Sequence, residues 1–149
     1  MRDDPTVIQM QIANKLDIDI SKDTEAIAAA RIREVVECAI NPGSNYRPAT
    51  QRQITYAASL RLDVRNDSFW VASAKINDRL KEMNDKALRQ LNLEPGDRVI
   101  VTKTTEIDEQ RHEYQEEHIV SSVGKNHRVY FKGGRGQGAW PIQITKVTS

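Results

Sequence analysis

An internal repeat is the feature that most constrains how this chain folds. When the sequence is laid on itself at an offset of 44 residues, positions 6–36 align with positions 50–80 without a gap, and nine pairs are identical. Ordinary residue frequencies would give roughly two. The identical pairs are Thr6/Thr50, Gln9/Gln53, Ala13/Ala57, Leu16/Leu60, Asp19/Asp63, Asp23/Asp67, Ala28/Ala72, Ala30/Ala74 and Ile32/Ile76. We interpret this pattern as an internal duplication.

Each copy carries the local signals of two helices joined by a short link. The pattern Thr-x-x-Gln, beginning at Thr6 and at Thr50, is typical of a capping box at a helix N-terminus. Thr24 and Ser68 then suit the N-cap of a second helix. The sequence therefore predicts superposable helix-link-helix units over residues 6–40 and 50–84. The residues predicted to face inward are Met10, Ala13, Leu16, Ala28, Ile32, Val36 and Ala39 in the first copy and Ile54, Ala57, Ala58, Leu60, Phe69, Ala72, Ile76, Leu80 and Met83 in the second.

The pattern changes to that of strands after residue 93. We expect a further short helix over residues 85–91 and a turn at residues 94–97. Strands rich in Val, Ile, Thr, Tyr and Phe are predicted over residues 98–104, 114–123, 128–132 and 142–147, with a hairpin turn at residues 124–127. The predicted division is residues 1–43 for the first helical repeat, 44–93 for the second repeat with the short helix, and 94–149 for a β module. The fold class is α+β.

The β segment resembles a small SH3-like barrel. The resemblance rests on a short strand after Pro-Gly-Asp (residues 95–97), a glycine-rich turn, and Trp140-Pro141 leading into a final strand. It implies a small barrel in which the aromatic residue near the final strand lines a binding groove, and so draws attention to Trp140 and Tyr130. The acidic connection over residues 106–117 departs from an ordinary peptide-binding groove of that family.

Composition limits the compartment and the partners. The 22 basic and 21 acidic side chains give a net charge of only +1, so any binding to a polyanion must use local patches. No apolar stretch approaches the length of a membrane span, and the acidic start is unlike a signal peptide, so we expect a cytoplasmic protein without membrane contact. The single cysteine, Cys38, is expected to be a buried structural thiol.

Two constellations favour nucleic acid. Residues 44–105 hold eleven Lys or Arg against seven Asp or Glu, whereas residues 1–43 hold five against eight, so the second repeat is the basic one. The glycine-rich run 133–138, followed by Trp140, offers backbone amides, a cation and a ring that could stack. The alternatives are a solvated helix face and a flexible turn beside a core Trp. The predicted nucleic-acid-binding residues are Arg47, Arg52, Arg61, Arg65, Lys75, Arg79, Tyr130, Lys132, Arg135 and Trp140.

Metal and catalytic motifs are missing from the sequence. His112 and His118 are six residues apart, which on a strand separates them by roughly 20 Å, too far for one ion. No nucleophile motif, metalloprotease motif or cysteine pair is present. We therefore expect no catalytic residue, no metal site and no cofactor. The sequence favours a non-catalytic nucleic-acid-binding protein; the alternative is a protein-interaction or assembly adaptor, and the oligomeric state stays open.

Overall fold

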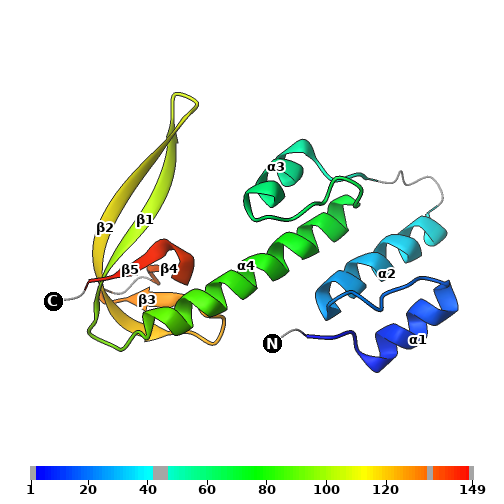
Figure 1. The fold of residues 1–149 in the computed structure, drawn as a ribbon, viewed down its shortest axis with the longest axis horizontal. Helices are drawn as coiled ribbons and strands as arrows, with labels where there is room; N and C mark the ends of the chain where they lie inside the picture. Colours follow the sequence, from blue (N-terminus) through cyan, green and yellow to red (C-terminus); the bar gives the residue numbers. More distant parts are fainter. Residues whose placement is uncertain (1–2, 42–46, 134–135, 148–149) are drawn as a thin grey trace. The chain divides into compact units, whose positions relative to one another are not determined.

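The computed structural model describes residues 3–41, 47–133 and 136–147 (Figure 1). The chain divides into two compact units, Met1–Leu80 and Lys81–Ser149. The first unit holds both sequence repeats, and the second holds a five-stranded antiparallel sheet. The fold is therefore α+β, with four N-terminal helices followed by an open sheet.

Both repeats begin a helix at the residue that the capping pattern predicted. Helix α1 (Val7–Leu16) is capped by Thr6 and α3 (Gln51–Ser59) by Thr50, each with both hydrogen bonds of the capping box. The second helices are α2 (Glu25–Ile40), capped by the Thr24 hydroxyl, and α4 (Phe69–Leu91), where the Ser68 hydroxyl accepts from the N–H of Val71. The predicted start points of the four helices are confirmed.

The links between the helices also share hydrogen bonds at equivalent positions. In the first copy the Gln9 side chain donates to the Glu25 carbonyl, and in the second the Gln53 side chain donates to the Phe69 carbonyl. The helix-ending residues Asp17 and Arg61, also 44 positions apart, both take a positive φ. Three further matched pairs of hydrogen bonds are Ile18 N to Ala13 O with Leu62 N to Ala57 O, Asp23 N to Ile20 O with Asp67 N to Val64 O, and Glu25 N to Asp3 O with Phe69 N to Arg47 O. The two copies therefore share their local structure and not only their residue pattern.

Small residues form the centre of each repeat. Ala13 and Ala28 are buried in the first repeat, and Ala57 and Ala72 in the second, which lets the two helices of a repeat approach closely. Ile20 in the first repeat and Val64 in the second fill the equivalent place in the link. Three of the residues predicted to face inward are instead exposed, because each lies on the outer side of its helix: Met10, Ala39 and Ala58.

The second repeat differs from the first at the start of its long helix. Phe69 and Trp70 replace Glu25 and Ala26, and their rings meet edge to face at 5.2 Å. The guanidinium of Arg33, from α2, lies over the Trp70 ring at 4.2 Å from its centre. This cation–π contact joins the first repeat to the aromatic residues that only the second repeat possesses.

The short helix predicted over residues 85–91 is not a separate element. It is the last part of α4, which runs unbroken from Phe69 to Leu91 and contributes residues to both compact units. Nothing in residues 81–84 breaks a helix, since that stretch contains neither Gly nor Pro. The expected break was therefore wrong.

The sheet has the strand order β4-β3-β2-β1-β5 and is antiparallel throughout. Its long strands are β1 (Arg98–Ile107) and β2 (Gln110–Val123). The short ones are β3 (Val129–Phe131), β4 (Gly138–Ala139) and β5 (Ile144–Lys146), with a 3₁₀ turn η1 (Pro141–Gln143) before β5. The predicted hairpin turn at residues 124–127 is confirmed, since the N–H of Gly124 bonds the carbonyl of Arg128.

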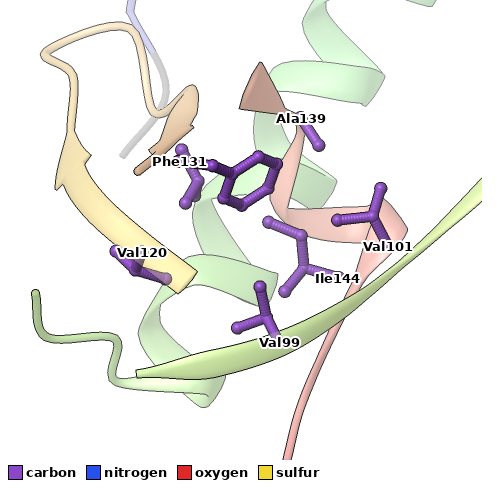
Figure 2. Packing of buried hydrophobic residues seen from close by; sticks show 7 residues of the cluster. Val99, Val101, Val120, Phe131, Ala139 and Ile144 are labelled. Carbon is purple, nitrogen blue, oxygen red and sulfur yellow. The ribbon is translucent and has the colours of Figure 1, made fainter. Parts of the chain in front are cut away.

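One face of the sheet forms the core of the second unit. Figure 2 shows Val99, Val101 and Val120 on the long strands facing Phe131 and Ile144. Partly buried leucines from the end of α4 and the following turn pack against this cluster: Leu88, Leu91 and Leu93. The side chains of β3 alternate accordingly, with Val129 and Phe131 buried and Tyr130 on the opposite face.

The sheet is not closed into a barrel, which corrects the expected SH3-like barrel. The edge strands β4 and β5 are not paired with one another. The acidic stretch over residues 106–117 is not a loose connection either. It is the outer part of a long β1–β2 hairpin, which turns at Asp108 and Glu109 with positive φ at both residues.

Candidate nucleic-acid interface

Trp140 lies at the surface of the second unit, next to a cation. Its side chain is 38% exposed, and the guanidinium carbon of Arg128 lies 5.5 Å from the centre of its ring. Arg128 is held near by a hydrogen bond of 3.4 Å to the carbonyl of Gly138. A core position for Trp140, the alternative considered from the sequence, is therefore wrong.

Tyr130 lies on the same side as Arg128, and the chain passes close to both residues at Gly138. Tyr130 is paired with Gly138 across β3 and β4. A Cβ on Gly138 would lie 2.6 Å from the carbonyl oxygen of Val129, 3.0 Å from Nε of Arg128 and 3.3 Å from the Tyr130 ring. Only glycine fits here. Arg128 therefore lies beside both Trp140 and the Tyr130–Gly138 pair, and we call Arg128, Tyr130 and Trp140 the aromatic face.

The stretch of sequence that carries the aromatic face has basic residues but no acidic ones. Residues 118–149 contain no Asp or Glu, and their five basic residues are Lys125, Arg128, Lys132, Arg135 and Lys146. Lys146 forms an ion pair with Asp97 at 3.3 Å. The exposed Lys125 and Lys132 have no acidic partner within the described ranges. This segment therefore carries cations that are available to an anion.

Arg128 was missed by the sequence reasoning. A signal was present, because a run of 32 residues without an acidic side chain is informative in a chain with 21 of them. The charge count over residues 44–105 ended before this run begins and therefore did not reveal it. Of the other predicted residues in this unit, Lys132 lies directly after β3, with its backbone N–H bonded to Ile119, and Arg135 falls outside the described residues.

Several predicted cations of the second repeat are already engaged within the unit. Arg65 forms two hydrogen bonds of 2.9 Å with the Asp63 carboxylate, and Lys75 forms an ion pair of 2.8 Å with Asp67. Arg79 donates to the carbonyl of Leu60 at 3.1 Å. Phosphate would have to compete with these partners, which lowers their value for binding a polyanion.

The remaining cations of the second repeat are more accessible. The guanidinium of Arg47 lies over the Phe69 ring at 4.3 Å from its centre and forms no ion pair with a described carboxylate. Arg52, on α3, and Arg61, just after α3, are exposed and form no ion pair in the part of the chain that the structure describes. These three belong to the first compact unit, and the aromatic face belongs to the second. Within the second unit, Arg128 links Trp140 to the Tyr130–Gly138 pair.

The histidines and the cysteine have ordinary surroundings. His118 stacks on Phe131 with ring centres 4.5 Å apart, and its Nε2 lies 2.9 Å from the Glu116 carboxylate. Among the described residues, no three His, Cys, Asp or Glu side chains are grouped as a metal site would require. Cys38 is exposed near the end of α2, so the expected buried thiol was wrong.

Local hydrogen bonds lower the pKa of several carboxylates, among them Asp63, Asp19 and Glu116. The Arg65 guanidinium and backbone N–H lower the pKa of Asp63 to about 2. In the first repeat, hydrogen bonds from Ser21 lower the pKa of Asp19. On β2, hydrogen bonds from Lys103 and then His118 lower the pKa of Glu116. All three therefore hold a negative charge at neutral pH, and none is a candidate general acid.

Comparisons with known proteins add no function to this geometry. Within the described ranges, no helix combines the length and the apolar character needed to cross a membrane. We found no family model, no curated protein and no solved structure that matches the chain.

Proposed function

We propose that this chain is a nucleic-acid-binding protein that holds a single strand on the aromatic face of its second unit. One observation carries the proposal: Arg128 lies over the Trp140 ring and beside Gly138, which is paired with Tyr130, in a segment that has no acidic residue. Aromatic rings accept any base by stacking, and nearby cations take the phosphates. The proposal contains no catalytic step.

Each side chain has a proposed role that follows from its chemistry. Trp140 would stack on a base, with Arg128 fixing the ring and adding its own charge. Lys125 and Lys132 would contact phosphates on either side. Because these contacts displace counterions, affinity should fall steeply as salt rises.

The basic second repeat would add a sequence-independent contribution. Arg47, Arg52 and Arg61 are the residues proposed for it, because none of them forms an ion pair with a carboxylate among the described residues. Arg65 and Lys75 are expected to contribute less, since each is held by an aspartate. Arg61→Ala should therefore reduce the salt dependence of binding more than Arg65→Ala does, and the two variants remove the same charge.

The proposal is tested by measuring affinity for a labelled single-stranded oligonucleotide of about 15 nucleotides across a salt series. Trp140→Ala should cost about 1–3 kcal/mol of binding free energy. Ile142→Ala is the matched control, because Ile142 is 43% exposed and lies two residues further along the chain. Circular dichroism must show native content for both variants. If folded protein at micromolar concentration binds neither single-stranded DNA nor RNA at low salt, the proposal is wrong.

A protein partner is the second candidate, and a different surface favours it. Helix α1 exposes Val7 (65%) and Ile8 (68%), where the second repeat has Gln51 and Arg52. An apolar helix surface of this kind is common at protein interfaces. Under this alternative, a partner that co-purifies from the native host would survive nuclease treatment and would be lost with Ile8→Gln.

A further inference from the structure

The β1–β2 hairpin extends well beyond the rest of the sheet. The two strands stay paired from Arg98↔Ile119 to Ile107↔Gln110, whereas β5 covers only Val99–Val101 of β1 and β3 covers β2 only from Val120 onward. Residues 102–107 and 110–115 therefore form a two-stranded ribbon, seen as the long hairpin in Figure 1, and the outer edge of β2 stays unpaired in the described structure as far as residue 118. Such an edge is a template for another strand, and a two-stranded ribbon alone is only marginally stable.

The backbone groups on the outer edge of β2 are those of its odd-numbered residues. Val120 both donates to Asp97 and accepts from Gly96, so its backbone points toward β1. The carbonyl of Ile119 accepts from Lys132 on the other side. Because the direction alternates along a strand, the N–H and C=O groups of residues 111, 113, 115 and 117 point to the free edge.

The charges along β2 are self-complementary in the register centred on Tyr114. If two copies of β2 pair antiparallel about a two-fold axis at Tyr114, Arg111 of each copy faces Glu117 of the other, and His112 faces Glu116. Moving the axis to residue 113 places Glu113 opposite itself. Moving it to residue 115 places Glu113 opposite Glu117. Directly opposed like charges destabilise a strand pair, so the register centred on Tyr114 is preferred.

We propose that the free edge of β2 pairs with the same edge of a second copy of this chain, centred on Tyr114. The outward backbone groups then form hydrogen-bonded pairs between residues 111 and 117 and between 113 and 115. Tyr114, 42% exposed in the single chain, meets its counterpart in a non-hydrogen-bonded pair, where side chains are closest. The ribbon is unsuited to nucleic acid, because residues 102–117 hold six acidic and two basic side chains.

Cysteine cross-linking of the full chain tests the register directly. In a Cys38→Ser background, Tyr114→Cys places two cysteines about 4.5 Å apart between their Cα atoms, within the range of a disulfide. Gln115→Cys is the matched control, because its counterpart lies about 8–9 Å away across the pair. Mild oxidation should yield a covalent dimer from Tyr114→Cys alone. No cross-link from Tyr114→Cys, or equal cross-linking of the two variants, overturns the proposal.

Proline at the two free edges tests the pairing without cysteine chemistry. Gln115→Pro removes an outward N–H from β2, and Thr104→Pro does the same on β1, where the backbone of the even-numbered residue Arg98 also points away from β2. In analytical ultracentrifugation, the natural chain and Thr104→Pro should sediment as dimers, and Gln115→Pro as a monomer. A natural chain that stays monomeric up to about 100 µM, or a dimer that survives Gln115→Pro, overturns the proposal.

Discussion

At the scale of single residues, the equivalent carboxylates Asp19 and Asp63 have different neighbours in the two repeats. The Asp63 carboxylate bonds the side chain and the backbone N–H of Arg65, and its pKa falls to about 2. The equivalent Asp19 has Ser21 in place of that arginine, and hydrogen bonds from Ser21 also lower its pKa. The two repeats thus place a hydroxyl in one copy and a guanidinium in the other beside the equivalent carboxylate.

Arg65→Ser should raise the pKa of Asp63 from about 2 toward its ordinary value of 3.8, because the hydrogen bonds from the guanidinium are its largest cause. A carboxylate whose pKa is depressed in the folded state adds stability above its unfolded pKa and loses it as pH falls. Any contribution of this pair is therefore present above about pH 4 and is lost toward pH 2. Titration of the Asp63 carboxyl by NMR measures the shift, with Asp19 as the internal control. An unchanged Asp63 pKa would contradict the assignment.

At the scale of elements, the capping boxes are the shared device that starts each repeat. Thr6→Ala and Thr50→Ala should each reduce the free energy of unfolding by about 1 kcal/mol, since each removes the acceptor for the N–H of Gln9 or Gln53. Thr55→Ala is the control on the exposed side of α3 and should stay within about 0.5 kcal/mol. Chemical denaturation measures all three. Unequal costs at Thr6 and Thr50 would show that the copies do not depend on their caps alike.

The helical repeats could be predicted from the sequence because their signals are local. A cap such as Thr50 and the residue it bonds, Gln53, lie within one turn, so the pattern alone identifies them. The sheet depends on distant pairs, as between Val99 and Lys146, and these fix where strands end. The sequence therefore predicted strands but missed β4, the length of the β1–β2 ribbon and the open edges.

In the candidate site, too, some residues could be named from the sequence and others only from the structure. Trp140 was named from the glycine-rich run before it, and Trp140 and Tyr130 from the resemblance to an SH3-like module. Arg128 was not named, because only the pairing of β3 with β4 brings it to Gly138. By contrast, the ion pair of Arg65 could have been anticipated from the sequence, since its partner Asp63 lies only two residues before it. Residue counting cannot separate a cation beside its own carboxylate from one facing solvent.

At the scale of the whole molecule, charge is sorted along the chain. The first repeat is acidic, the second is basic, the ribbon is acidic, and residues 118–149 carry only basic side chains. A net charge of +1 conceals this order. Added salt should therefore weaken polyanion binding at the basic surfaces. It should also weaken the ion pairs across the proposed strand pairing, but less steeply.

The most direct measurement of the central claim is the fluorescence of Trp140 itself. The chain has two tryptophans, so Trp70→Phe leaves Trp140 as the only reporter, and Trp140→Phe leaves Trp70 as the control in the first unit. Base stacking should quench the emission of Trp140 as single-stranded oligonucleotide is added, with the same dissociation constant that anisotropy gives, while the emission of Trp70 stays constant. If Trp140 emission does not change at oligonucleotide concentrations that saturate binding, the nucleic acid does not lie on the aromatic face.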